Sequence, residues 1–252
     1  MIRRRSVLGG SILAGLLPLL ARGGALADGF DPRPLALVYR GPAAYRRSSN
    51  AVAALLSGSG LPLRVEFVGP DEPRRLDAGT LAGAVVYAQP GGGTLAHAWG
   101  IMADHADDIR GFVDGGGHYL GFCLGGYLAG ATPGFDLLPG DTYRYIDSPD
   151  AEADTPEDAV ISVRWRGRPM RMFFQDGPGF RVAPDRVSVL ATYDDGSPAA
   201  LVCRYGRGRV GVSGPHPEAT AGWFTAANLD DTDAVHIGTG RDLLDTALFG
   251  LP

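Results

Sequence analysis

The sequence predicts an α/β fold in which helices cover both faces of a mostly parallel sheet and antiparallel strands extend that sheet in the second half. In the first half, short continuous apolar runs alternate with segments of helical spacing. This alternation is typical of parallel strands that are buried on both faces. After about residue 134, strand-like runs follow one another with turn residues between them, which indicates antiparallel hairpins.

Four strands and two helices are expected in the first half. The strands are Leu35–Tyr39, 63–68, 83–87 and His118–Phe122, and the helices are 48–56 and 102–113. Ser49 or Asn50 is the expected N-cap of the first helix, because a side-chain oxygen there can accept a free N–H of the first turn. The glycines at 115–117 are expected to end the second helix.

Five strands and a final helix are expected in the second half. The strands are Ala159–Trp165, 170–174, Val187–Tyr193, 199–205 and 210–213, and the helix is 242–249. Gly167 and the segment 206–208 mark the turns of two hairpins. Residues 140–157 are rich in Asp, Pro and Ser, and we expect them to form an exposed excursion.

Residues 1–27 have the pattern of a secretory signal. Arginines at positions 3–5 precede an apolar run over 7–20, and Ala25-Leu26-Ala27 is a small-x-small cleavage site. The segment 4–8 resembles a twin-arginine signal, which predicts a periplasmic location and no stable membrane span after cleavage. An ordinary secretory signal or an uncleaved anchor is the alternative. Residues 28–252 are expected to form one domain, long enough to bury its own core.

The charge balance argues against an anionic partner. The whole chain carries a net charge of −5, and loss of the signal, with four arginines and no acidic residue, leaves −9. Nucleic-acid binding needs a basic footprint, so we expect no nucleic-acid partner and no binding to an anionic membrane surface.

The run Gly121-Phe122-Cys123-Leu124-Gly125-Gly126 places a cysteine between a strand and the start of a helix. This is the pattern of a nucleophile elbow, where glycines flank the turn because side chains there would clash. The positive end of a helix favours the thiolate form of a cysteine, which is the attacking species. A buried cysteine at a tight strand–helix junction is the alternative.

Gly214-Pro215-His216-Pro217-Glu218 follows an expected strand, which places His216 at the edge of the sheet where catalytic groups gather. A histidine beside the thiol would act as base and then acid, and Glu218 would hold its other ring nitrogen. A surface loop is the alternative.

A glycine loop ends the third expected strand. Gly91, Gly92 and Gly93 follow Pro90, and their N–H groups, with that of Leu124, would form an oxyanion hole. A phosphate cradle is the alternative, but no Gly-Lys-Ser/Thr follows.

These three segments resemble the signatures of class I glutamine-amidotransferase-like domains. Within that group, residues 116–127, Asp176-Gly177-Pro178 and 214–218 are most similar to the N-terminal family of biotin–protein ligases. The resemblance covers roughly residues 35–249 and implies a flavodoxin-like three-layer sandwich. It implies Cys123 as nucleophile, His216 as base and Glu218 as orienting acid, with Gly92 and Leu124 donating to the oxyanion. We expect no cofactor and no metal ion.

The chain departs from the pattern of glutaminases at Tyr127. Glutaminases of this class usually carry Gln at that position, four residues after the cysteine, so the departure argues against glutamine as the substrate. No ligase catalytic domain fits in this length, so biotin transfer is not expected. Tyr127, Gln175 and Asp176 are the expected substrate contacts. For the last two, a hairpin turn with a solvated Asp is the alternative.

Four further residues lie outside these motifs. Cys203 is expected to be a small buried side chain, with a disulfide to Cys123 as the alternative that would exclude catalysis. Trp99 either caps the pocket or packs as a core aromatic. His97 and His105 do not form a metal site by their spacing.

Two functions are compatible with these observations. The first is a periplasmic cysteine hydrolase that acts on an amide or similar acyl bond of a small molecule or peptide. The second is a non-catalytic module that uses the same pocket to bind a ligand or partner, because function depends on the site and not on the fold.

Overall fold

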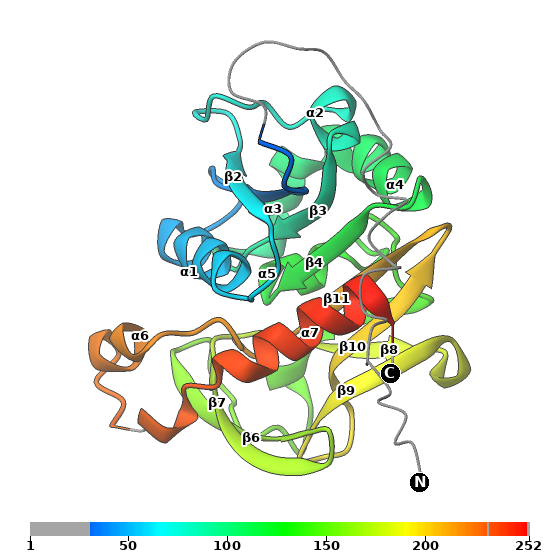
Figure 1. Cartoon of the computed structure of the whole chain (residues 1–252). Coiled ribbons are helices and arrows are strands. Elements are labelled where there is room, and N and C mark those ends of the chain that lie inside the picture. The colour runs from blue at the N-terminus through cyan, green and yellow to red at the C-terminus, as the bar shows by residue number, and fades with distance from the viewer. Residues whose placement is uncertain (1–30, 231, 251–252) are drawn as a thin grey trace, which may run out of the picture.

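The computed structural model describes residues 31–230 and 232–250, and its central feature is a nine-stranded sheet (Figure 1). The strands are β1 (Leu35–Tyr39), β2 (Arg64–Val68), β3 (Ala84–Gln89), β4 (His118–Phe122), β5 (Gly140–Arg144), β6 (Ala159–Trp165), β7 (Arg168–Phe174), β8 (Pro178–Val182), β9 (Val187–Tyr193), β10 (Pro198–Tyr205) and β11 (Gly208–Ser213). The helices are α1 (Arg46–Ser57), α2 (Ala78–Ala82), α3 (Leu95–Met102), α4 (Ala106–Asp114), α5 (Leu124–Leu128), α6 (Ala221–Ala226) and α7 (Ile237–Phe249). The expected signal at 1–27 lies outside the described residues.

The sheet has a parallel half and an antiparallel half. Its strand order is β2-β1-β3-β4-β11-β10-β9-β6-β7. The five strands from β2 to β11 pair in parallel, and the pairs from β11 to β7 are antiparallel. The predicted change from parallel to antiparallel pairing is therefore confirmed. Because β3, β4 and β11 are parallel neighbours, the loops at their carboxyl ends emerge side by side.

Two helical layers cover the sheet, as the alternation of side chains along β4 illustrates. Leu120 belongs to an apolar cluster with α1 and α7, whereas Tyr119 belongs to a cluster with α3 and α4. Both side chains are fully buried, because every residue of β4 lies between two layers. Figure 1 shows α7 crossing the middle of the sheet. The predicted three-layer sandwich is confirmed.

Several predicted helix boundaries were wrong. The segment 102–113 is not one helix, because α3 ends at Met102 and a 3-10 turn over Ala103–His105 separates it from α4. The side chain of Thr94 caps α3. Helix α1 begins at Arg46, and neither predicted residue caps it: the hydroxyl of Ser49 donates instead to the carbonyl of Tyr45. Helix α7 begins five residues before the predicted start.

The prediction of an exposed excursion at 140–157 was wrong in part, because many of its residues are exposed but the segment also forms a strand and buries two side chains. Strand β5 pairs with β8 in a separate two-stranded sheet, and the ring of Tyr145 stacks on Tyr193 at 3.7 Å between centroids. Tyr145 and Ile146 are buried. The polar composition hid these contacts because their partners lie far along the chain.

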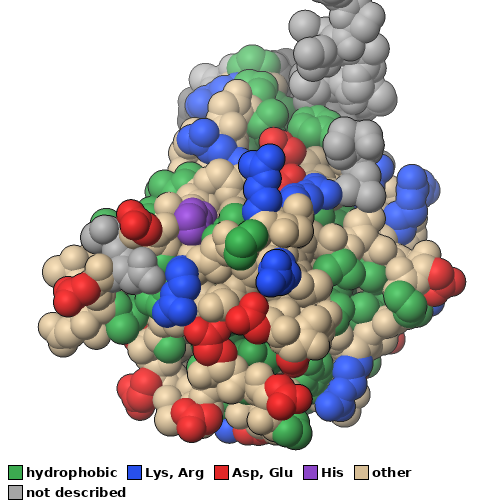
Figure 2. Space-filling model, turned by 90° about the horizontal axis from the view of Figure 1, so that it is seen from below, with side chains coloured by type: hydrophobic (Ala, Val, Ile, Leu, Met, Phe, Trp, Pro, Cys, Tyr) green, Lys and Arg blue, Asp and Glu red, His purple; other side chains and the backbone are tan. Residues whose placement is uncertain are grey.

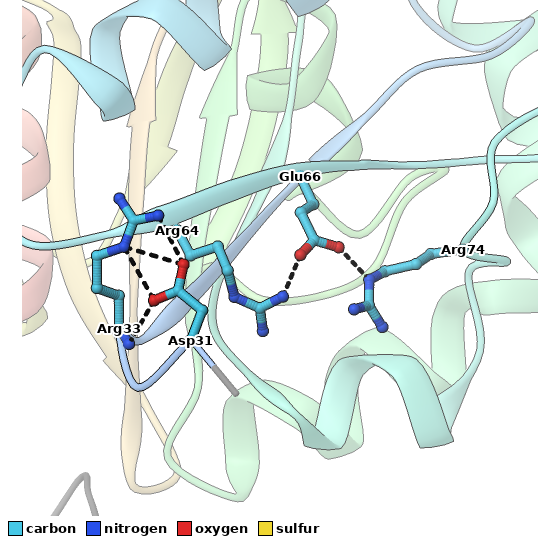
Figure 3. Close-up of polar contacts among 5 residues, drawn as sticks. All are labelled: Asp31, Arg33, Arg64, Glu66 and Arg74. Carbon is cyan, nitrogen blue, oxygen red and sulfur yellow. Dashed lines mark hydrogen bonds and ion pairs between the residues drawn. The ribbon is translucent and has the colours of Figure 1, made fainter. Parts of the chain in front are cut away.

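Charged side chains border the free edge of the sheet at β2. Glu66 on β2 forms ion pairs with Arg64 and Arg74, and Arg33 pairs with Asp31 at 2.6 Å (Figure 3). Charged side chains along an edge strand discourage pairing with another chain. Figure 2 shows basic, acidic and apolar side chains interspersed over the face seen from below. Within the described residues, no helix is long and apolar enough to cross a membrane.

Candidate functional site

Three loops from adjacent parallel strands form the candidate site. The glycine loop follows β3, Cys123 follows β4, and the segment with His216 follows β11. A fourth segment joins them from the antiparallel half, because the N–H of His216 donates to the carbonyl of Phe173 at 2.9 Å. This edge of a parallel sheet is where α/β proteins bind their ligands.

Cys123 lies on a strained turn between β4 and α5. Its backbone has φ 49° and ψ −104°, a conformation that an L-residue rarely adopts, and its N–H donates to the carbonyl of Ser213 at 2.8 Å. Such backbone strain costs roughly 1–3 kcal/mol and concentrates at functional sites. The sequence prediction of an elbow agrees with this local geometry. The thiol is 7% exposed, so it lies below the surface at the base of the site.

The neighbouring glycines are required by close backbone approaches. A Cβ on Gly125 would lie 2.0 Å from the carbonyl oxygen of Gln89, which no side chain permits. A Cβ on Gly91 would lie 2.9 Å from Cε1 of His216 and 3.2 Å from Cβ of Cys123. The glycine loop therefore touches both the cysteine and the histidine, and the three predicted segments meet.

His216 and Glu218 form a buried pair. Nδ1 of His216 lies 2.9 Å from Oε1 of Glu218, and the two residues are 3% and 2% exposed. Burial lowers the pKa of His216, but the charge of Glu218 and the adjacent Cys123 outweigh it and raise this pKa to about 10. The rings of Phe173 and Trp223 stand edge-on to the imidazole at 5.8 and 5.2 Å. The orientation of His216 and its protonated, charged form are therefore favoured by its surroundings.

The thiol and the imidazole are neighbours, and the hydrogen bond of the thiol is directed to a backbone carbonyl. Sγ of Cys123 donates to the backbone carbonyl of Gln175 at 3.2 Å, and Nε2 of His216 is buried without a partner among the described residues. Cys123 nevertheless contributes to the raised pKa of His216, which reflects their proximity. In the protonated ring that this pKa implies, the N–H of Nε2 is therefore free to donate to a thiolate or to a bound molecule.

Two backbone N–H groups belong to the segments that meet at the cysteine, those of Gly92 and Leu124. Tyr45 donates its N–H to the carbonyl of Gly91 at 2.9 Å. Because a trans peptide directs its C=O and N–H to opposite sides, the N–H of Gly92 points away from Tyr45. Leu124 begins α5, so its N–H has no acceptor within the helix. Gly93 has φ 73° and open space around its Cα.

The three predicted substrate contacts lie around the thiol and differ in their hydrogen-bond partners. The hydroxyl of Tyr127 is buried and has no hydrogen-bond partner in the part of the chain that the structure describes, and burial, together with the charge of Asp176, raises its pKa. Asp176 has φ 47° and accepts three hydrogen bonds from Arg144, at 2.9, 2.9 and 3.2 Å. Of the alternative, a hairpin turn with a solvated Asp, the structure shows a carboxylate that is 28% exposed and engaged by Arg144 on β5. Gln175 holds the thiol through its carbonyl.

Two side chains beside the site escaped the sequence analysis. Arg47 on α1 lies over the ring of Trp223, with 4.9 Å between Cζ and the ring centroid. Its Nη2 donates to Oε1 of Gln175 and to Oδ1 of Asp158, both at 3.3 Å. Neither Arg47 nor Trp223 lies in a recognisable motif. Only the long-range packing of α1 and α6 brings them to the histidine.

The remaining candidates lie elsewhere in the molecule. Both cysteines are free, and burial raises the pKa of Cys203 to about 12, so the disulfide alternative is excluded. Cys203 lines an open depression of about 640 Å³ between β9–β11 and the end of α7. Trp99 packs on Phe135, 6.1 Å between centroids, as a core aromatic. No group of three or more His, Cys, Asp or Glu suited to a metal ion occurs within 31–230 and 232–250.

Sequence comparisons connect the chain to biotin–protein ligases. Residues 79–142 match the profile of the family described as "Biotin-protein ligase, N terminal", a segment that contains the glycine loop and Cys123. The chain is 27% identical over 186 residues to a biotin–protein ligase of Schizosaccharomyces pombe. That alignment covers 59% of this chain, which spans 28% of the relative's length.

Structural comparisons identify the fold. A solved glutamine amidotransferase matches with a TM-score of 0.57 and 17% identity, over 84% of this chain and 98% of its own. A glutamine amidotransferase from Thermotoga maritima matches with a TM-score of 0.57 and 15% identity, over 86% and 99%. An exo-β-1,4-mannosidase from an Opitutaceae bacterium has a TM-score of 0.52 and 18% identity, over 86% and 36%. The chain therefore has the class I glutamine-amidotransferase-like fold that its sequence predicted, and its similarity to the N-terminal family of biotin–protein ligases is confirmed.

Proposed function

We propose that this chain is a cysteine-dependent hydrolase that cleaves an amide or a related acyl bond. One observation carries the proposal: a strained, shielded cysteine at the start of a helix lies beside a histidine that a buried carboxylate orients. Many acyl-transfer enzymes have this arrangement, in which a nucleophile lies beside a base and a third group orients the base. The fold shared with glutamine amidotransferases supports the same class of chemistry.

The residues have separate roles in the proposed reaction. Cys123, as a thiolate beside the imidazolium of His216, attacks the carbonyl carbon, which gives a tetrahedral oxyanion. The N–H groups of Gly92 and Leu124 donate to this oxygen, and the glycines on either side of Gly92 shape the loop. His216 then protonates the leaving amine, and a thioester to Cys123 remains. Water attacks the thioester, with His216 as base, and releases the acid and the free thiol.

Glu218 keeps His216 in its working orientation throughout. Its Oε1 takes the hydrogen bond of Nδ1, so Nε2 is the nitrogen that faces the reaction. A change of the Cys123 rotamer moves Sγ from the carbonyl of Gln175 to Nε2. Substrate binding drives this change when the substrate displaces the thiol from that carbonyl. The unpartnered hydroxyl of Tyr127 and the side chain of Gln175 bind the substrate, and Asp176, engaged by Arg144, positions the turn.

Acetyl transfer from 4-nitrophenyl acetate tests the proposal without knowledge of the natural substrate. We expect release of 4-nitrophenol and an acetyl adduct on Cys123, detected by peptide mass spectrometry. Cys123→Ala abolishes the adduct, and Cys203→Ala serves as the matched control with unchanged rate. Because general acid–base groups contribute about 10²–10⁴-fold, His216→Asn is expected to slow acylation at least about 100-fold. Absence of the adduct, or independence from His216, refutes the hydrolase and leaves a non-catalytic binding module.

We also propose that residues 1–27 direct export by the twin-arginine route to the periplasm. The paired arginines at 4 and 5, the apolar run and the small-residue cleavage site support this proposal. Fractionation of cells that produce the full chain tests it. We expect the cleaved protein in the periplasm and retention of the Arg4→Lys/Arg5→Lys variant in the cytoplasm. Unchanged export of the variant refutes the twin-arginine route.

A further inference from the structure

Three arginines line an open depression at the end of β11 that is opposite to the candidate site. The depression, of about 640 Å³, lies between β9–β11 and the end of α7, and its lining includes Arg186, Arg204 and Arg209. Arg209 is the second residue of β11, whereas the segment with His216 follows the other end of that strand. A ligand in the depression would therefore be separate from the proposed hydrolase site.

The three arginines lie at the same end of three adjacent strands. Arg204 and Arg209 are directly opposed in the antiparallel pairing of β10 with β11, so their side chains share one face of the sheet. Like charges in such a pair destabilise the sheet. Arg186 immediately precedes β9, and the first residue of β9 pairs with Cys203, next to Arg204 on β10. The sequence thus concentrates positive charge where the sheet alone gains nothing from it.

Within the part of the chain that the structure describes, no ion pair neutralises these three charges. Arg186 and Arg204 are exposed, and their side chains form no hydrogen bond with a described residue. Asp185 also lines the depression, but it forms no ion pair with these arginines. Arg209 donates to the carbonyl of Leu248 near the end of α7, where a cation is favourable. That contact explains Arg209 and leaves the other two arginines without a structural role.

The groups beside Arg209 experience the uncompensated positive charge. Burial and the charge of Arg204 lower the pKa of Arg209. On its other side, Arg209 is in register with His118 on β4. Burial and the charge of Arg209 lower the pKa of His118 to about 4, and its buried Nδ1 has no hydrogen-bond partner among the described residues. An anion in the depression would therefore relieve repulsion that the folded chain otherwise retains.

We propose that this depression is a binding site for a phosphate group, carried by a small molecule or free. A phosphate ester has about 1.5–2 negative charges at pH 7 and three acceptor oxygens, and guanidinium groups bind it through paired N–H donors. A carboxylate, with one charge and two oxygens, leaves more of the positive charge unbalanced. The depression is within the size range of small-molecule sites, about 300–1,000 Å³. The exposed ring of Phe249 in its lining offers an apolar surface to the rest of an ester.

Calorimetric titration with three probes tests the site. Phenyl phosphate and benzoate share a ring and differ in their anionic group, and inorganic phosphate lacks the ring. We expect phenyl phosphate to bind at least about tenfold more tightly than benzoate, because it accepts more charge-assisted hydrogen bonds. Both phosphate probes should bind: tighter binding of phenyl phosphate identifies an ester as the ligand, and equal affinity identifies free phosphate. Benzoate that binds as tightly as phenyl phosphate, or no binding of either phosphate, overturns the proposal.

Paired substitutions place the binding in the depression. We expect Arg186→Gln/Arg204→Gln to weaken the binding of phenyl phosphate at least about tenfold. The matched control is Arg164→Gln/Arg168→Gln, which removes two exposed arginines from β6 and β7 that form no ion pair among the described contacts. It should change the affinity less than about twofold. Equal weakening in both double variants contradicts the proposal, because the effect would then reflect net charge alone.

Arg204→Glu is a second test, in a variant that is expected to fold at least as stably as the wild type. The new carboxylate lies directly opposite Arg209, so an attractive pair replaces a repulsive one. Urea titration checks the stability of this variant. We expect it to lose measurable binding of phenyl phosphate, since the carboxylate repels the anion and occupies Arg209. A stable Arg204→Glu variant that binds phenyl phosphate like the wild type is incompatible with the proposed site.

Discussion

Replacement of Glu218 by Gln separates the effect of its charge from the effect of its shape. The amide keeps the size of the side chain and still offers an oxygen to Nδ1 of His216, 2.9 Å away in the wild type. It removes the charge that opposes the effect of burial on the pKa of His216. With a pKa of about 10, His216 is about 99% protonated at pH 8. In Glu218→Gln, burial remains the largest influence and lowers this pKa.

We therefore expect His216 in the variant to titrate below pH 8, so that less than about half of it is protonated there. Nitrogen NMR of the imidazole rings measures this directly, and His216→Asn assigns the signals by their loss. Glu152→Gln, which removes a carboxylate from a pair with Arg171 far from the site, is the control and leaves the titration unchanged. A wild-type His216 that is neutral at pH 8, or the same midpoint in wild type and Glu218→Gln, refutes this account of the buried pair.

Four further outcomes are expected. The raised pKa of His216 contributes stability that is fully present below pH 6.5 and is lost as the pH rises through about 10. In urea titrations, the free energy of unfolding of the wild type should therefore decline relative to that of Glu218→Gln as the pH rises through this window. Gly91→Ala places a methyl group 2.9 Å from Cε1 of His216 and should slow alkylation of Cys123 at least about tenfold, whereas Gly100→Ala on α3 meets open space and should not. Leu120→Ala in the fully buried β4 should lower the free energy of unfolding by about 2–5 kcal/mol in urea titrations. Burial raises the pKa of Asp242, but hydrogen bonds from Arg166 and Trp165 outweigh burial and lower this pKa. Asp242→Asn should therefore lower the free energy of unfolding by roughly 1–3 kcal/mol at pH 7. This difference should vanish as the pH falls below 3.8 and through the lowered pKa of the folded state.

The sequence predicted the parallel half of the fold because its signals are local. Strands β1 and β4 lie between two helical layers, so every residue in them is buried. Their sequences are therefore continuous apolar runs that are easy to recognise. The segment around Cys123 was recognisable for a similar reason. Gly121 and Gly125 are fixed by backbone contacts within the elbow and with the end of β3, so their spacing marks the turn. The order of three loops along the chain then identified the edge where they meet.

The contacts that complete the site were beyond the sequence analysis because they join distant segments. Gln175 and Cys123 are 52 residues apart, Arg144 and Asp176 are 32 apart, and Arg47 meets Gln175 across 128 residues. None of these pairs follows a periodic pattern or a motif. The polar composition of 140–157 predicted an exposed segment without a role in the site, although β5 in this segment supplies Arg144, which binds Asp176. The hydrogen bond from His216 to the carbonyl of Phe173 and the close approach of Gly177 to Gly214 bring these segments to the end of β11.

The rate of Cys123 alkylation by iodoacetamide, followed from pH 5 to 9 in the wild type and in His216→Ala, tests the central claim most directly. Cys203 is an unreactive internal reference, because it is buried and its pKa is raised to about 12. If the imidazolium of His216 activates the thiol, Cys123 in the wild type reacts at pH 6 at least about tenfold faster than in His216→Ala. Equal rates in the two proteins at pH 6, or no reaction of Cys123 at any pH, contradict the proposed hydrolase.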